Sequence, residues 1–156
     1  MINNQKMRIV TLIVLLTLNL SSFGIFASTT TDLADKMIAQ LDECEAFSQS
    51  DRLVCLQKQA KQSQLALQQA EQNAFNLLSK WDDDEQFILL AKRKLTLSNE
   101  AFAHYRDVHC QYFKSLGGGA ITNALEMRRL TCVSKLNYRQ ADQLGHELSD
   151  LNLKNK

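Results

Sequence analysis

The chain has 156 residues, of which 45% are hydrophobic, and its 18 basic and 17 acidic side chains leave it close to neutral. This balance excludes the strongly basic surface that nucleic acid or an anionic membrane favours, so we expect neither as a partner. The length suits one domain with a modest core, and a domain of this size gains stability from covalent staples.

Residues 1–27 have the pattern of a secretory signal peptide. Lys6 and Arg8 precede an apolar run from Ile9 to Leu20, and small and polar residues then lead to the end of the segment at Ala27. The run is shorter than the roughly 20 apolar residues of a spanning helix, so we expect cleavage and no membrane span afterwards. The mature protein would then be periplasmic or secreted, with 16 basic and 17 acidic side chains.

All four cysteines lie in the predicted mature domain, residues 28–156, and an even number in an exported chain indicates two disulfides. Three pairings are open, and we favour the sequential one, Cys44 with Cys55 and Cys110 with Cys132. An unbroken helix would hold the first two cysteines about 16 Å apart, whereas a disulfide needs Cα atoms roughly 4.4–6.8 Å apart. The chain must therefore turn between them.

The first predicted helix spans Asp32 to Phe47, and Ser48–Asp51 supplies residues that cap helices and initiate turns. A second helix spans Leu53 to Trp81, with Ser63 as the one polar residue in its apolar stripe. The stripe repeats every three or four residues through Leu56, Ala60, Leu67, Ala70, Ala74 and Leu77. The chain has no proline to interrupt these helices.

Carboxylates at Asp82–Glu85 open a third predicted helix, because negative charge is favoured at the positive end of the helix dipole. A calcium loop is the weaker interpretation, since it would need ligands spread over about 12 residues and a sharp glycine turn. The third helix continues to Leu116, and Gly117–Gly119 forms a flexible bend before a fourth helix from Ile121 to Leu151. The inward positions predicted for the fourth helix are Leu125, Cys132, Leu136, Leu144, Leu148 and Leu151. The sequence thus predicts an all-α fold, a small bundle of about four helices in two hairpins, each stapled across its bend by a disulfide.

No residue pattern predicts a catalytic, metal or cofactor site. His104 and His109 stand five apart and so point to different sides of a helix, and an oxidised Cys110 is no zinc ligand. Paired cysteines offer no nucleophile, and the sequence holds neither a nucleophile elbow nor a P-loop. We therefore expect a non-enzymatic protein without a cofactor.

Arg106 and Asp107 lie one helical turn before Cys110 and allow two interpretations. In the first, the pair is part of an ordinary solvated helix face. In the second, Arg106 has a specific role: it either reaches across to the fourth helix and orders the hairpin of the second disulfide, or faces a partner protein. Sequence alone leaves these interpretations open.

The motif Tyr105-Arg106-Asp107-x-x-Cys110, with the glycine loop and Cys132 after it, resembles the LprI family of lysozyme inhibitors. The spacing of the first two cysteines is also similar to that family's first cysteine pair, so the resemblance spans most of the mature chain. Asn99 stands where the family usually has glutamine. The resemblance implies a periplasmic or cell-surface protein without catalysis, some members of whose family are associated with blocking lysozyme.

Lysozyme presents two carboxylates in its cleft, so a blocker would insert a cationic or polar side chain there. The candidate residues for partner binding or for structure are Tyr105, Arg106, Asp107, Arg128 and Arg129. The alternative function is a structural or adaptor helical module of the periplasm without lysozyme activity. An inhibitor should depend on the loop from Leu116 to Thr122 and its basic neighbours, whereas an adaptor should depend on helix faces. The predicted partner is thus lysozyme or another envelope protein, and the oligomeric state stays open.

Overall fold

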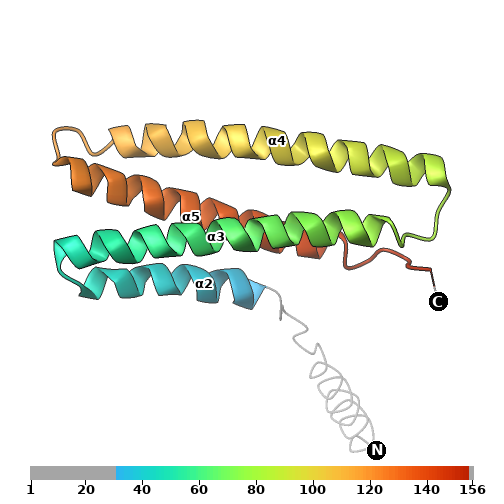
Figure 1. Ribbon diagram of the computed structural model, residues 1–156, viewed down its shortest axis with the longest axis horizontal. Helices are drawn as coiled ribbons and strands as arrows, with labels where there is room; N and C mark the ends of the chain where they lie inside the picture. The colour runs from blue at the N-terminus through green and yellow to red at the C-terminus, as the bar shows by residue number, and fades with distance from the viewer. Residues whose placement is uncertain (1–30, 155–156) are drawn as a thin grey trace, which may run out of the picture.

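The computed structural model describes residues 31–154, so the predicted signal peptide lies outside the described residues. The helices are α2 (Thr31–Glu43), α3 (Gln49–Leu78), α4 (Glu85–Ser115) and α5 (Thr122–Glu147), and a short 3-10 turn, η2 (Cys44–Ala46), joins α2 to α3. The three long helices lie side by side, and α2 packs along α5 at one end of the bundle (Figure 1). The predicted all-α fold is confirmed. Among the helices of residues 31–154, none is long and apolar enough to cross a membrane.

Two disulfides clamp two helical hairpins, as predicted. Cys44 is bonded to Cys55 and Cys110 to Cys132, with Cα–Cα distances of 5.7 and 5.5 Å. The first bond joins η2 to α3 across the α2–α3 bend, and the second joins α4 to α5 below the glycine loop. Both bends lie at the same end of the bundle (Figure 1). The covalent staples are therefore concentrated towards one end of the molecule.

Helix α3 begins at Gln49, four residues before the predicted start. Ser48 is its N-cap, and the Ser48 Oγ accepts a hydrogen bond from the Asp51 backbone N–H at 3.4 Å, which satisfies a donor that the first helical turn leaves unpaired. Ser48–Asp51, which the sequence predicted as a turn, are thus the N-cap and the first turn of α3. The first predicted helix was expected to end at Phe47, but α2 ends at Glu43 and the chain continues as the 3-10 turn η2.

Helix α5 is the central helix, since it contacts α2, α3 and α4. Because neighbours cover it on three sides, its buried positions form a wide arc rather than one stripe. These positions are Met127, Leu130, Cys132, Ser134, Asn137, Tyr138 and Leu144. Of the inward positions predicted from sequence, Cys132 and Leu144 are buried, and the others are half-buried. The arc therefore includes polar residues that a search for leucine periodicity passes over.

The predicted continuation of the last helix to Leu151 is wrong, because α5 ends at Glu147. The chain instead turns along the α3–α4 connection, where Leu153 pairs with Trp81 in an antiparallel bridge. The Asp82 N–H donates to the Asn152 carbonyl at 2.8 Å, and the Lys154 N–H donates to the Lys80 carbonyl at 2.8 Å. These backbone bonds tie the C-terminal tail to the end of the bundle opposite the disulfides.

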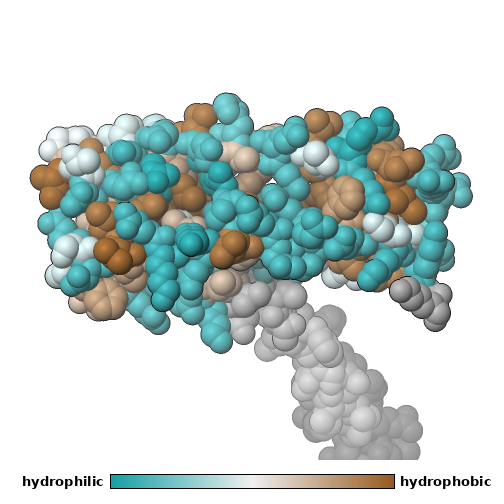
Figure 2. Space-filling model, viewed as in Figure 1, coloured by the Kyte–Doolittle hydropathy of each residue, from teal (hydrophilic) through white to brown (hydrophobic). Residues whose placement is uncertain are grey.

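The best-packed part of the core lies near the first disulfide. It consists of Leu41, Cys44, Leu56, Met127 and Leu130, contributed by α2, η2, α3 and α5. Helix α4, in contrast, contributes only Cys110 to the buried residues of the described chain. Hydrophobic side chains reach the surface in the upper part of the molecule, where α4 lies (Figure 2). Helix α4 is therefore the least enclosed of the long helices.

Candidate functional site

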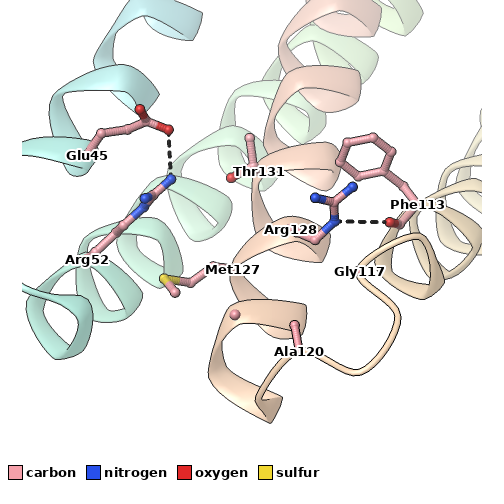
Figure 3. Close-up of a pocket in the computed structure, with 9 residues that line it drawn as sticks. Glu45, Arg52, Phe113, Gly117, Ala120, Met127, Arg128 and Thr131 are labelled. Atoms are coloured by element: carbon pink, nitrogen blue, oxygen red, sulfur yellow. Dashed lines mark hydrogen bonds and ion pairs between the residues drawn. The ribbon is translucent and has the colours of Figure 1, made fainter.

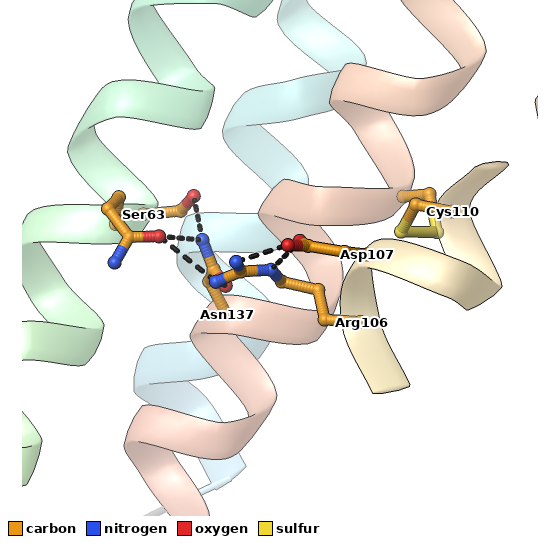
Figure 4. A network of polar contacts seen from close by, with 7 residues as sticks. Ser63, Arg106, Asp107, Cys110 and Asn137 are labelled. Atoms are coloured by element: carbon orange, nitrogen blue, oxygen red, sulfur yellow. Dashed lines mark hydrogen bonds and ion pairs between the residues drawn. A yellow bond between two sulfur atoms is a disulfide. The ribbon is translucent and has the colours of Figure 1, made fainter. Parts of the chain in front are cut away.

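A polar cluster joins α3, α4 and α5 beside the second disulfide (Figure 4). We call it the Arg106 cluster, and its members are Ser63, Gln64, Arg106, Asp107 and Asn137. The Arg106 Nη1 donates to Gln64 Oε1 at 3.0 Å and to Asn137 Oδ1 at 3.1 Å, while its Nε and Nη2 donate to Asp107 Oδ1 at 2.9 and 2.8 Å. The Arg106 side chain is only 13% exposed. Of the two interpretations from sequence, the solvated helix face is therefore wrong, and Arg106 reaches the last helix.

Asn137 is the centre of the Arg106 cluster and is fully buried. Its amide oxygen accepts from Arg106, while its Nδ2 donates to Ser63 Oγ at 3.1 Å. The Ser63 hydroxyl in turn donates to the Ala60 carbonyl at 2.8 Å. Because an amide is both donor and acceptor, one side chain satisfies partners on two other helices. The sequence pattern singles out Ser63 as a polar residue in an apolar stripe but not Asn137, which has no such apolar residues spaced around it in the sequence.

Glu71 lies on α3 within the electrostatic range of Arg106. Burial raises the pKa of the Glu71 carboxyl above its usual range, and the positive charge of Arg106 acts in the opposite direction. Arg106 therefore has two roles in this region: it bonds directly to α5, and it offsets part of the desolvation of a nearby acid.

A hollow of about 360 Å³ lies at the glycine-loop end, between the loop, α3 and α5 (Figure 3). It is lined by Glu45, Arg52, Phe113, Gly117, Ala120, Ala124, Met127, Arg128 and Thr131. On one side Arg52 forms an ion pair with Glu45 at 2.7 Å. On the other side the Arg128 guanidinium lies 4.8 Å from the centre of the Phe113 ring, a cation–π contact. The hollow therefore has fixed charged side chains on both walls.

Gly117 leaves room for the side chains of Leu125 and Arg128. A Cβ at Gly117 would overlap the Leu125 side chain and would lie 3.2 Å from Arg128 Cδ. The Arg128 Nε donates weakly to the Phe113 carbonyl at 3.4 Å, and within residues 31–154 its terminal nitrogens make no hydrogen bond or ion pair. Arg128 thus presents free donors at the edge of the hollow.

Arg129 is part of an ion-pair group that ties α4 to α5. Its Nε donates to Glu126 Oε1 at 3.0 Å, and Lys114 Nζ lies 3.3 Å from Glu126 Oε2. The hydrogen bond from Arg129 is the main cause that lowers the pKa of the Glu126 carboxyl below its usual range, and the same bond raises the pKa of Arg129. Arg129 is therefore committed to a contact inside the protein.

Tyr105 points away from the bundle. It is 52% exposed and stacks on His109, with ring centroids 5.3 Å apart. The predicted candidates therefore do not form one site: Arg106 belongs to the Arg106 cluster and Asp107 to its exposed edge, Arg129 to an ion pair, Arg128 to the hollow and Tyr105 to the outer face of α4. Within the described part of the chain, no group of histidine, cysteine or acidic side chains is arranged to hold a metal ion.

Together, the fold and its contacts define a class of protein: a disulfide-stapled helical bundle whose long helices are joined by a buried polar cluster. No family model, no curated protein and no solved structure matches the chain.

Proposed function

We propose that this chain is an exported binding protein of the bacterial cell envelope that blocks a lysozyme-type muramidase with the glycine-loop end of the bundle. The observation that carries the proposal is Arg128, which holds its free guanidinium donors beside the hollow and next to Gly117. The resemblance of the cysteine frame and of the Tyr105–Cys110 motif to LprI-type inhibitors supports the choice of partner.

The chemistry of Arg128 suits the cleft of a muramidase, which carries two carboxylates. A guanidinium stays charged at every physiological pH and offers donors in the planar geometry that matches a carboxylate. Contact with the Phe113 ring restricts the Arg128 side chain before any partner binds. Less side-chain entropy is then lost on binding, which favours affinity.

The other two basic candidates are less suited to a partner. Arg106 is almost enclosed and already donates to three side chains, and Arg129 is paired with Glu126. Removing either from its partners would leave an acceptor or a carboxylate without its donor, which costs free energy. Arg128 is therefore the residue that we assign to the partner.

Export is supported by the cysteines as well as by the signal-peptide pattern of residues 1–27. The four cysteines of the described chain form two disulfides, and such bonds persist in oxidising compartments such as the periplasm. These two observations support the proposal that the mature protein is periplasmic.

The test is a titration of the protein, recovered from the periplasm of an expressing bacterium, into lysozyme with a cell-wall substrate. We expect inhibition by the wild type and a loss of at least about 10-fold in inhibitory affinity for Arg128→Ala, since truncating one side of a desolvated charge pair costs about 2–5 kcal/mol. Arg139→Ala is the matched control, because Arg139 is an exposed arginine on the same side of α5, about 16 Å further along the helix.

Unchanged lysozyme activity at a large excess of the wild-type protein would overturn the muramidase proposal. A pull-down from periplasmic extract with the same protein then tests the alternative. Capture of a different envelope protein, with retention that is the same for Arg128→Ala, would assign the chain to structural or adaptor modules instead.

A further inference from the structure

Helix α4 and its C-cap residue expose a line of mostly apolar side chains along the outer side of the helix. We call it the outer stripe, and its members are Phe87, Leu90, Leu97, Tyr105, Val108, Tyr112 and Leu116. Each is between 43% and 59% exposed. At 3.6 residues per turn, all of these positions lie within about 60° of a single line along the helix. Lys94 and Ala101, both exposed, lie on the same line.

The outer stripe is separate from the face with which α4 packs on the bundle. That inner face carries Cys110, bonded to α5, and Arg106, which donates to α3 and α5. A helix on the surface of a bundle ordinarily has one apolar side and one polar side. A second apolar side that runs the full length of α4 is therefore a candidate interaction surface.

The size of the outer stripe suits a protein interface. An aromatic side chain has about 150–250 Å² of surface, and leucine and valine have somewhat less. Since each member of the outer stripe is about half exposed, the stripe presents about 700 Å² of mostly apolar surface. A standard stable interface buries about 800 Å² on each partner. Two such stripes facing each other would therefore meet the usual requirement for a stable dimer.

We propose that a second copy of this chain covers the outer stripe, with the two α4 helices antiparallel about a two-fold axis near Ala101. This inference does not depend on the proposed muramidase inhibition, which rests on Arg128 of α5. The stripe is close to symmetric about Ala101. Leu97 faces Tyr105 of the second copy, and Phe87 and Leu90 similarly face Leu116 and Tyr112.

Ala101, at the axis, fits this arrangement, because its small side chain lets two helices approach closely where they meet. Lys94 lies opposite Val108 of the second copy, where its aliphatic stem covers the valine while the ammonium stays in water. An isologous contact of this kind closes on itself and limits the assembly to two chains.

Lys94, which lies on the outer stripe itself, favours the antiparallel order. An antiparallel pair sets each Lys94 opposite Val108 of the second copy. A parallel pair would set the two Lys94 ammonium groups beside each other across the interface, which is unfavourable.

The test measures the mass of the periplasmically expressed protein by sedimentation equilibrium between about 1 and 100 µM. We expect dimers for the wild type and, for Leu97→Glu, a dissociation constant raised at least about 100-fold, since two carboxylates would be buried without partners. Leu65→Glu is the matched control, because Leu65 on α3 is 57% exposed and Leu97 is 56% exposed. It should leave the dimer unchanged.

Ala101→Cys provides a second measurement, because a two-fold axis at this position allows a disulfide between copies. We expect a covalent dimer at protein concentrations where Ser149→Cys, at an exposed position beyond α5, stays monomeric. A wild type that is monomeric at about 100 µM overturns the proposal. So does a monomer that captures another protein through Leu97, because the stripe would then belong to a different partner.

Discussion

A few buried polar side chains form hydrogen bonds that join the three long helices to one another. Asn137 accepts from Arg106 on α4 and donates to Ser63 on α3, and all three side chains lie at least mostly out of solvent. A buried group that loses its partner keeps the cost of its desolvation, about 1–3 kcal/mol. The free energy of the Arg106 cluster therefore depends on every member being present.

We expect Asn137→Ala to lower the free energy of unfolding by about 2–4 kcal/mol, because it removes one acceptor of Arg106 and the donor to Ser63 Oγ and opens a small cavity. Urea denaturation of the oxidised protein measures this value. Asn76→Ala, at an exposed position of α3, is the control and should change stability by no more than about 0.5 kcal/mol. Equal losses for the two variants would show that the buried cluster contributes no stability.

The ion pair between Glu126 and Arg129 predicts a pH dependence of stability. The pKa of Glu126 lies below its ordinary value of 4.5 in the folded protein. Its contribution is therefore fully present above pH 4.5 and is lost as the pH falls through the folded-state pKa. We expect Glu126→Gln to be less stable than the wild type at pH 7 and the difference to shrink in acid, as measured by urea denaturation at each pH. A difference that grows in acid would contradict this assignment.

Sequence patterns found some of these residues and missed others for a physical reason. Ser63 was visible because apolar positions frame it on both sides along one stripe of α3. Asn137 was not visible, since α5 is covered on three sides and its inner arc mixes Ser134, Asn137 and Tyr138 with leucines. The function of a buried amide depends on partners 31 and 74 residues away in the chain, which no local pattern specifies.

In the glycine loop, two of the three glycines are favoured by the local structure, so the loop is more than a flexible connection. Gly118 has a positive φ of 55°, which disfavours any side chain, and a Cβ at Gly117 would meet Leu125 and Arg128. Gly119 has neither restriction, because nothing lies within 4 Å of a Cβ placed there. The interpretation of the loop as a flexible bend was therefore incomplete.

We expect Gly117→Ala and Gly118→Ala to lower the melting temperature, each by a loss of about 1–2 kcal/mol in stability, through overlap in the first case and backbone strain in the second. Gly119→Ala should be neutral or slightly stabilising, since it reduces the freedom of the unfolded chain. Differential scanning calorimetry of the three variants compares adjacent glycines under the same conditions. Equal effects at all three positions would mean that the loop has no defined shape.

The sequence predicted the existence of the helices and disulfides better than the residues at which the helices end. Both disulfides could be assigned because a turn signal lies between the cysteines of each pair. The end of α5 could not, because it is fixed by backbone pairing of the tail with Lys80 and Asp82, about 70 residues earlier in the chain. Leu148 and Leu151 continue a helical spacing that this long-range pairing interrupts.

The molecule as a whole has two unlike ends. One end holds both disulfide-clamped bends and the best-packed core, while the other is held by Trp81 and the paired C-terminal tail. Helix α4 runs between these ends and is buried only at Cys110, close to the stapled end. Its first half, Glu85–Ser98, therefore has few contacts to oppose local opening.

Hydrogen exchange measured by mass spectrometry tests this difference between the ends. In the Leu97→Glu variant, expected to be monomeric, we predict that amides of Glu85–Ser98 exchange faster than those of Tyr105–Ser115 by at least about 10-fold. Helix α3 is the internal control, because its buried residues run from Leu56 to Leu78 and should give even protection. In the wild type at dimer-forming concentration, the first half of α4 should slow towards the rate of the second half, because a second copy covers Phe87 and Leu90. Equal rates along α4 in the monomer would instead show that the inner face alone holds the whole helix, and the second copy would then add affinity without adding order.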